Sequence, residues 1–300
     1  MVPNKPHETK KYLLDQTSPD EIQKLKQYGE RYLKFHWDYY CELAYQRSSV
    51  EVEIRHALLD AVVGPFKFKK WQRVLRWKYS NEPLCVAGSL TDPGGRFNIG
   101  DISKDHFKPF PALYVAKDKE TALQEALCQS ISKENEKRAL ESALANPTST
   151  TNCSMSGKLY RLLDLNKPKK LQEFIDVIKD FRIPEDLRRR ARIFKETLEL
   201  ATTVQNLMEG VLINNWRVWP MQFDVPAPSQ ILGQLVVGIG VEGILYPSKF
   251  TTKDCLAIFP QNFDESGAYI KLDDSPPSKE VLTEINCDVW RKNKTEMMGE

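Results

Sequence analysis

The sequence predicts an α+β protein with an N-terminal helical region. Three observations support this prediction. Residues 1–70 carry apolar side chains at the three- and four-residue spacing of helices, short apolar runs between turn residues begin at Trp71, and charged amphipathic segments separate several of these runs. Because the expected strands do not alternate strictly with helices, an α+β arrangement is favoured over a doubly wound parallel sheet.

Two helices are expected within residues 1–70. The segment Ser18-Pro19-Asp20-Glu21 offers a serine as N-cap, a proline at the first helical position and a glutamate three residues after the cap, which is typical of a helix start. This helix should continue to about Gln46. A second helix is expected over residues 50–62, before the turn residues Gly64 and Pro65.

Residues 71–275 are expected to form the main domain, and residues 276–300 a C-terminal tail. Apolar runs predict strands over residues 71–77, 112–116, 158–163, 243–246 and 255–259. Helices are expected over residues 119–131 after an N-cap at Asp118, over residues 184–208, and from Ser229 onwards. Polar residues 133–157 are expected to be an exposed connection, and residues 166–215 a helical insertion.

Charge and composition narrow the function classes. With 43 Lys and Arg against 41 Asp and Glu, the net charge is +2, and no whole-protein field that attracts nucleic acid or anionic lipid is expected. The basic, aromatic run at residues 66–71 and the arginines within residues 188–192 suit nucleic acid locally. Acidic residues surround both segments, so nucleic-acid binding is not favoured.

The N-terminus and the cysteines indicate the cellular compartment in which the protein is expected. The chain starts without an apolar leader segment, and no apolar stretch reaches the length of a membrane span. Its six cysteines are scattered, without the paired spacing of a zinc site or a disulfide framework. We therefore expect a cytoplasmic protein with reduced thiols, no metal site and no membrane association.

The most informative segment is residues 91–100, which contains two glycines directly before Arg96. Paired glycines let the backbone approach a ligand closely, and the planar guanidinium of an arginine offers a fork of donors to an anion. The alternative is a hairpin turn with a surface arginine. Asn98, two residues later, either contacts a ligand or caps the turn.

Three further polar residues lie on expected strands and a helix. Arg76 is at the end of the first strand of the main domain, Tyr114 is inside the next, and Glu125 follows eleven positions after Tyr114, in a helix and beside apolar positions. A partly buried carboxylate needs a reason. Each residue also has an ordinary interpretation: Arg76 as an exposed strand residue, Tyr114 as a core tyrosine and Glu125 on a solvated helix face.

Three segments, in this order, are similar to one protein family. They are Gly94-Gly95-Arg96-Phe97-Asn98, then Leu113-Tyr114-Val115-Ala116 with Thr121-Ala122-Leu123-Gln124-Glu125, and finally Gly243-Ile244-Leu245-Tyr246-Pro247-Ser248. Over residues 71–259 the chain resembles the RES domain, named for its arginine, glutamate and serine.

That resemblance implies a fold, an activity and a site. The implied fold is an ADP-ribosyltransferase-like core of small mixed or antiparallel sheets with surrounding helices. Members act as toxins that deplete NAD⁺ and are typically paired with an antitoxin, so NAD⁺ is the implied substrate and no cofactor is needed. By resemblance the site comprises Arg76, Arg96, Tyr114, Glu125 and Ser248.

These residue types suit cleavage of NAD⁺. Arg76 and Arg96 can hold the diphosphate with charge-assisted hydrogen bonds, and the face of Tyr114 can stack on the cationic nicotinamide ring. Breaking the glycosidic bond builds positive charge on the ribose, which the carboxylate of Glu125 can stabilise. For Ser248, a supporting hydrogen bond is favoured over direct catalysis.

The expected function is therefore an NAD⁺ glycohydrolase or phosphorylase acting as a toxin. One alternative keeps the fold and transfers ADP-ribose to a protein or small molecule, because the loops around a cleft select the acceptor. The other is a non-catalytic module that binds nucleic acid or protein. The N-terminal helices and the helical insertion could form a homodimer surface, a surface for a partner such as an antitoxin, or a lid.

Overall fold

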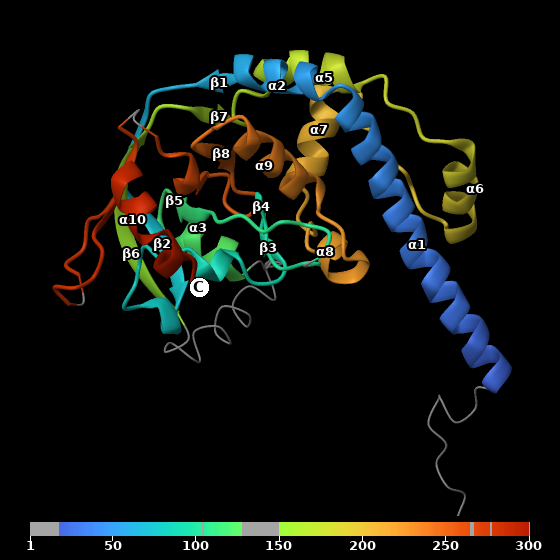
Figure 1. The fold of residues 1–300 in the computed structure, drawn as a ribbon, viewed down its shortest axis with the longest axis horizontal. Coiled ribbons are helices and arrows are strands. Elements are labelled where there is room, and N and C mark those ends of the chain that lie inside the picture. Colours follow the sequence, from blue (N-terminus) through green and yellow to red (C-terminus); the bar gives the residue numbers. More distant parts are fainter. Residues whose placement is uncertain (1–17, 104, 128–149, 265–266, 277, 300) are drawn as a thin grey trace, which may run out of the picture. The chain divides into compact units, whose positions relative to one another are not determined.

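A computed structural model describes residues 18–103, 105–127, 150–264, 267–276 and 278–299 (Figure 1). The chain divides into two compact units. The described residues within 1–44 and 182–198 form the first unit, and the described residues within 45–181 and 199–300 form the second. In the described residues, no helix is both long and apolar enough to cross a membrane.

The first unit contains most of α1 (Pro19–Ser49) and all of α6 (Glu185–Phe194). The predicted start of α1 is confirmed: Ser18 N–H donates to the Glu21 carboxylate at 2.8 Å, and Glu21 N–H donates to Ser18 Oγ at 3.3 Å. Phe35 of α1 is fully buried and its ring centroid lies 5.4 Å from that of Phe194. Arg190 adds an ion pair to Asp38 at 2.6 Å, so aromatic packing and a salt bridge hold the two helices together.

The prediction of a single helix over residues 184–208 is wrong, because α6 and α7 (Val204–Val211) are separate helices. Lys195 ends α6 in the left-handed region, with φ of 58°. A new start then follows, in which Thr203 Oγ1 accepts a hydrogen bond from Asn206 N–H at 3.1 Å. The amphipathic pattern of residues 184–208 therefore spans two helices, because it continues past the end of α6 and the threonine N-cap of α7.

The second unit is built on a nine-stranded sheet (Figure 1). Among the described strands, only β7 and β8 pair in parallel, and the other neighbours are antiparallel, so the predicted α+β class is confirmed. In spatial order the strands are β1 (Val62–Val63), β7 (Leu162–Asp164), β8 (Gly243–Pro247), β9 (Asp254–Ile258), β5 (Leu113–Ala116), β2 (Phe66–Arg76), β6 (Thr150–Leu159), β10 (Tyr269–Leu272) and β11 (Glu284–Ile285). A separate hairpin pairs β3 (Gly94–Gly95) with β4 (Asn98–Ile99).

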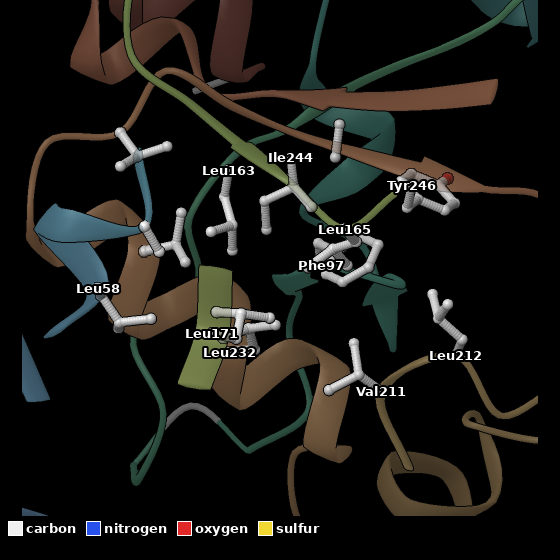
Figure 2. Packing of buried hydrophobic residues seen from close by; sticks show 14 of the residues in the cluster. Leu58, Phe97, Leu163, Leu165, Leu171, Val211, Leu212, Leu232, Ile244 and Tyr246 are labelled. Atoms are coloured by element: carbon white, nitrogen blue, oxygen red, sulfur yellow. The ribbon is translucent and has the colours of Figure 1, made fainter. Parts of the chain in front are cut away.

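Helices cover both faces of this sheet. One hydrophobic cluster joins the sheet to α2 (Glu51–Asp60), α5 (Gln172–Ile178), α7 and α9 (Pro228–Gly238), as the packing around Ile244 and Leu232 shows (Figure 2). The cluster on the opposite face includes Trp290 and Met297 of α10 (Cys287–Met298). The other helices of the described residues are α3 (Lys119–Leu127), α8 (Val218–Phe223) and short 3-10 turns at Trp77–Tyr79, Ala87–Ser89, Pro168–Leu171 and Pro260–Asn262.

The N-terminal boundary differs from the expected one at residue 70. Helix α2 packs in the core of the second unit, where Ile54 and Leu58 are 1% exposed, and β2 already begins at Phe66. Of the two helices expected within residues 1–70, only α1 contributes to the separate helical unit. Amphipathic spacing and the start and stop signals predicted both helices, but these signals do not show which sheet or helix buries the apolar face.

The prediction that residues 133–157 form an exposed connection is also wrong in part. Residues 150–157 belong to β6, and residues 133–149 lie outside the described part of the chain. Along β6, Cys153, Met155 and Leu159 are buried while the intervening polar side chains are more exposed. The strand expected over residues 158–163 breaks at Tyr160, whose N–H donates to the Glu242 carboxylate at 2.6 Å.

Candidate active site

A pocket of about 210 Å³ lies over four adjacent strands of the sheet. Its floor is one row of directly opposed residues, because Tyr246 pairs with Cys255, Cys255 with Ala116, and Ala116 with Gln72. Opposed residues on neighbouring strands point to the same face of a sheet. The lining is completed by Val74, Gly95, Arg96, Tyr114, Val115, Ala122, Glu125, Ala126, Trp216 and Arg217.

The β3–β4 hairpin brings Arg96 to this pocket. Arg96 and Phe97 are the two residues between the paired strands, so the predicted turn is present. The arginine is only 6% exposed and is therefore not the surface residue of the alternative interpretation. Its Nη1 donates to the carbonyl of Ile213 at 2.8 Å, which fixes the guanidinium at the pocket wall.

The two glycines before Arg96 serve different purposes. Gly94 has φ of 89°, where a side chain would be strained. At Gly95 an added Cβ would lie 2.5 Å from Cε2 and from the hydroxyl oxygen of Tyr114. Gly95 therefore permits close contact between the hairpin and the strand that carries the tyrosine.

Asn98 is fully buried and holds the hairpin together. Its Oδ1 accepts from Gly95 N–H and from the Tyr114 hydroxyl, both at 2.9 Å, and its Nδ2 donates to the carbonyl of Ser89 at 2.7 Å. Asn98 does not line the pocket. Of its two predicted roles, this geometry favours the turn over ligand contact.

Sequence reasoning missed Gln230, the second support of the hairpin. This side chain is fully buried at the start of α9, and its Nε2 lies 2.8 Å from the carbonyl oxygen of Pro93 and 3.0 Å from that of Asn98. Its Oε1 accepts from Ala227 N–H at 3.0 Å. The helix expected from Ser229 onwards places this glutamine near a helix start, but nothing in the local sequence indicates that its side chain reaches the hairpin.

Tyr114 uses its hydroxyl within the protein. The hydroxyl oxygen accepts from Phe97 N–H at 2.9 Å while the O–H donates to Asn98. Burial raises the pKa of this phenol above its ordinary value, and the hydrogen bond from Phe97 and the charges of Arg96 and Arg217 act in the opposite direction. Tyr114 therefore stays neutral, and its aromatic ring is the part available to a ligand.

Glu125 lies on α3, is half-buried and lines the pocket. The predicted N-cap is present, since Asp118 Oδ1 accepts from Thr121 N–H at 2.9 Å. Burial raises the pKa values of Tyr246 and Cys255, and the negative charge of Glu125 raises both further. The described end of α3 at Leu127 leaves residues 128–131 of the predicted helix outside the described part of the chain.

Ser248 does not line the pocket but supports the helix that carries Glu125. Its Oγ accepts from Phe250 N–H at 3.1 Å and closes the turn that follows β8. From this turn, Thr251 Oγ1 lies 2.8 Å from Thr121 Oγ1 at the start of α3. Lys253 also forms a 2.8 Å ion pair with the capping residue Asp118.

Arg76 lies outside the pocket lining. It is exposed at the last position of β2 and pairs in register with Thr150. Side chains alternate along a strand, so Arg76 shares a face with the lining residues Gln72 and Val74. The structure thus brings Arg96, Tyr114 and Glu125 together, whereas Arg76, Asn98 and Ser248 are not among the lining residues.

Trp216 and Arg217 were missed as candidates. Both line the pocket, and Trp216 is only 2% exposed. In the sequence they follow the helical insertion and belong to no regular period, so neither spacing nor local turn chemistry indicated their position.

The fold and the pocket define an α+β protein in which two arginines, two tyrosines and one carboxylate surround a single cavity. More specifically, the chain belongs to the RES domain family, whose model matches residues 70–277. The predicted resemblance is therefore confirmed.

No curated protein matches the chain. Among solved structures, it is similar to a chain in the crystal structure of the M. tuberculosis MbcT–MbcA toxin–antitoxin complex, with 12% identity and a TM-score of 0.40. The match covers 83% of this chain and 98% of that chain.

Proposed function

We propose that this pocket cleaves the bond between nicotinamide and ribose in NAD⁺. The observation that supports the proposal is the convergence of Arg96, Tyr114 and Glu125 from a hairpin, a strand and a helix on one cavity. Membership of the RES domain family adds support, because NAD⁺ breakdown is the activity that the family resemblance implies.

The size of the pocket suits one end of the dinucleotide. Pockets that enclose a whole small-molecule ligand typically measure about 300–1,000 Å³. At about 210 Å³ this pocket is smaller, so the nicotinamide and its ribose would enter while the adenosine end extends outside. The aromatic faces of Tyr114 and Trp216 suit the flat cationic ring, and Arg96 suits the diphosphate.

In the proposed reaction, the C–N glycosidic bond breaks and its electron pair passes to the nicotinamide nitrogen, which becomes neutral. Positive charge then develops on the ribose, and the carboxylate of Glu125 stabilises it electrostatically. Water or phosphate attacks the ribose carbon, giving ADP-ribose or its 1-phosphate. When water attacks, Glu125 can accept the proton that it loses.

The biological part of the proposal is a toxin that depletes NAD⁺ and is neutralised by an antitoxin. It is supported by the family resemblance alone. The helices outside the sheet offer surface for such a partner.

Mass spectrometry of the products tests the chemical proposal. Purified full-length protein is incubated with NAD⁺ in buffers with and without phosphate. The expected products are nicotinamide with ADP-ribose, or with ADP-ribose 1-phosphate when phosphate is present. Intact NAD⁺ in both buffers would contradict the proposal, and ADP-ribose recovered mainly on protein would favour the transferase alternative.

A further inference from the structure

Residues 213–217 orient one arginine of the pocket and also provide two of the residues that line it. The carbonyl of Ile213 holds the guanidinium of Arg96 at 2.8 Å, and Trp216 and Arg217 line the cavity. The guanidinium carbon of Arg217 lies 4.4 Å from the centroid of the Trp216 ring. Because Trp216 is almost fully buried, its ring is held in place, and stacking on it orients the guanidinium of Arg217.

The pocket therefore contains two guanidinium groups in its wall, those of Arg96 and Arg217. Among the described residues, neither Arg96 nor Arg217 forms an ion pair, and the guanidinium of Arg217 makes no hydrogen bond. Arginine carries five N–H donors. Two such groups on one cavity favour a ligand with at least two negative charges, since a buried positive charge is normally paired.

Arg76 does not fit this role as well. It is exposed at the end of β2 and outside the lining, whereas Arg217 is half-buried and inside it. Arg96 and Arg217 also act on the same phenol, because the positive charges of both favour ionisation of Tyr114. Both arginines thus lie close to the tyrosine proposed to stack on the ligand.

We propose that Arg217, held by stacking on Trp216, is the second arginine that binds the diphosphate of the substrate together with Arg96. This inference rests on the proposed function for the identity of the ligand. It makes residues 213–217 part of the binding site, since they orient one arginine through a carbonyl and supply the other.

The test compares ligands with and without the diphosphate. Calorimetry measures the Kd of ADP-ribose, and nicotinamide release measures the KM of NAD⁺ and of nicotinamide riboside, which has no phosphate. In Arg217→Gln, both the Kd of ADP-ribose and the KM of NAD⁺ should rise about ten- to a hundredfold, as expected for a lost charged hydrogen bond. The KM of nicotinamide riboside should stay within about threefold of wild type. Arg291→Gln, on the exposed face of α10, is the matched control.

Several results would overturn the inference. An unchanged Kd for ADP-ribose in folded Arg217→Gln would do so, as would an equal rise in KM for the phosphate-free substrate, which would indicate a packing role. A larger effect in Arg76→Gln than in Arg217→Gln would return the role to Arg76. If Arg217→Gln does not fold, Arg217→Lys keeps the charge, and wild-type affinity for ADP-ribose in that variant would contradict a bidentate, stacked guanidinium.

The outcome separates this inference from the proposed function. Wild-type protein that binds ADP-ribose without cleaving NAD⁺ would refute the proposed function, and the binding series would still decide the role of Arg217. Protein that cleaves NAD⁺ with an unchanged KM in Arg217→Gln would refute this inference alone. Failure of the wild-type protein to bind ADP-ribose would overturn it directly.

Discussion

Replacing Gly95 with alanine tests whether the hairpin must contact Tyr114 closely. The added Cβ would lie 2.5 Å from Cε2 and from the hydroxyl oxygen of Tyr114, against ordinary contacts of 3.4–4 Å. The hairpin and the ring must therefore separate by about 1 Å, which strains the hydrogen bond between Phe97 N–H and the tyrosine. Overpacking costs about 1–3 kcal/mol and a lost hydrogen bond about 0.5–1.5 kcal/mol.

The expected loss is thus about 1.5–4.5 kcal/mol of unfolding free energy, or a fall in Tm of about 3–18 °C for a unit of this size. Urea denaturation followed by circular dichroism measures the change, and nicotinamide release should fall with it because Arg96 is the next residue. Gly210→Ala in α7 is the control, since its Cβ would meet no atom within 4 Å, and it should be neutral or stabilising by up to about 1 kcal/mol. Equal stability of Gly95→Ala and wild type would refute the close-contact argument.

Three other predictions concern side chains around the same pocket. Tyr114→Phe should lower the free energy of unfolding by about 1–3 kcal/mol, measured by urea denaturation, because Phe97 N–H loses its acceptor. The folded variant should nevertheless retain kcat within about tenfold of wild type. A larger loss of kcat would indicate that the hydroxyl takes part in the chemistry. Thr121→Val should lower kcat several-fold and the free energy of unfolding by about 0.5–1.5 kcal/mol, because α3 loses its hydrogen bond to Thr251. Thr121→Ser should restore kcat and stability, and failure of that rescue would contradict a positioning role for Thr121. Burial raises the pKa of the Cys255 thiol, so its stabilising contribution is complete below the unfolded pKa of about 8.5 and is lost as pH rises above that value. The unfolding free energy of Cys255→Ala should therefore fall less steeply above pH 8.5 than that of wild type, and identical slopes would contradict the shift.

The site residues could be predicted where local chemistry determines them. Gly94, with its positive φ, and Asn98, which closes the hairpin, are turn residues that a sequence pattern indicates directly. The strand of Tyr114 and the helix of Glu125 follow from periodicity and from the Asp118 cap. Local signals therefore placed these residues on the right elements.

The pocket itself depends on contacts between distant segments, which no local pattern contains. Gln72 and Ala116 become neighbours only through the order of strands in the sheet. Arg217 reaches the cavity from a segment after the helical insertion, and Gln230 reaches the hairpin from α9. The strand β6 was missed because polar residues such as Ser154 and Ser156 lie on its less buried face and conceal the alternation.

The central claim is that Glu125 makes this pocket an NAD⁺-cleaving site. Nicotinamide release from NAD⁺ tests it most directly, measured for wild type, Glu125→Gln and the control Glu120→Gln, which changes an exposed carboxylate on the same helix. Glu125→Gln should lower kcat by about a hundredfold or more with a preserved fold, while Glu120→Gln should match wild type. Wild-type kcat in folded Glu125→Gln would contradict the account.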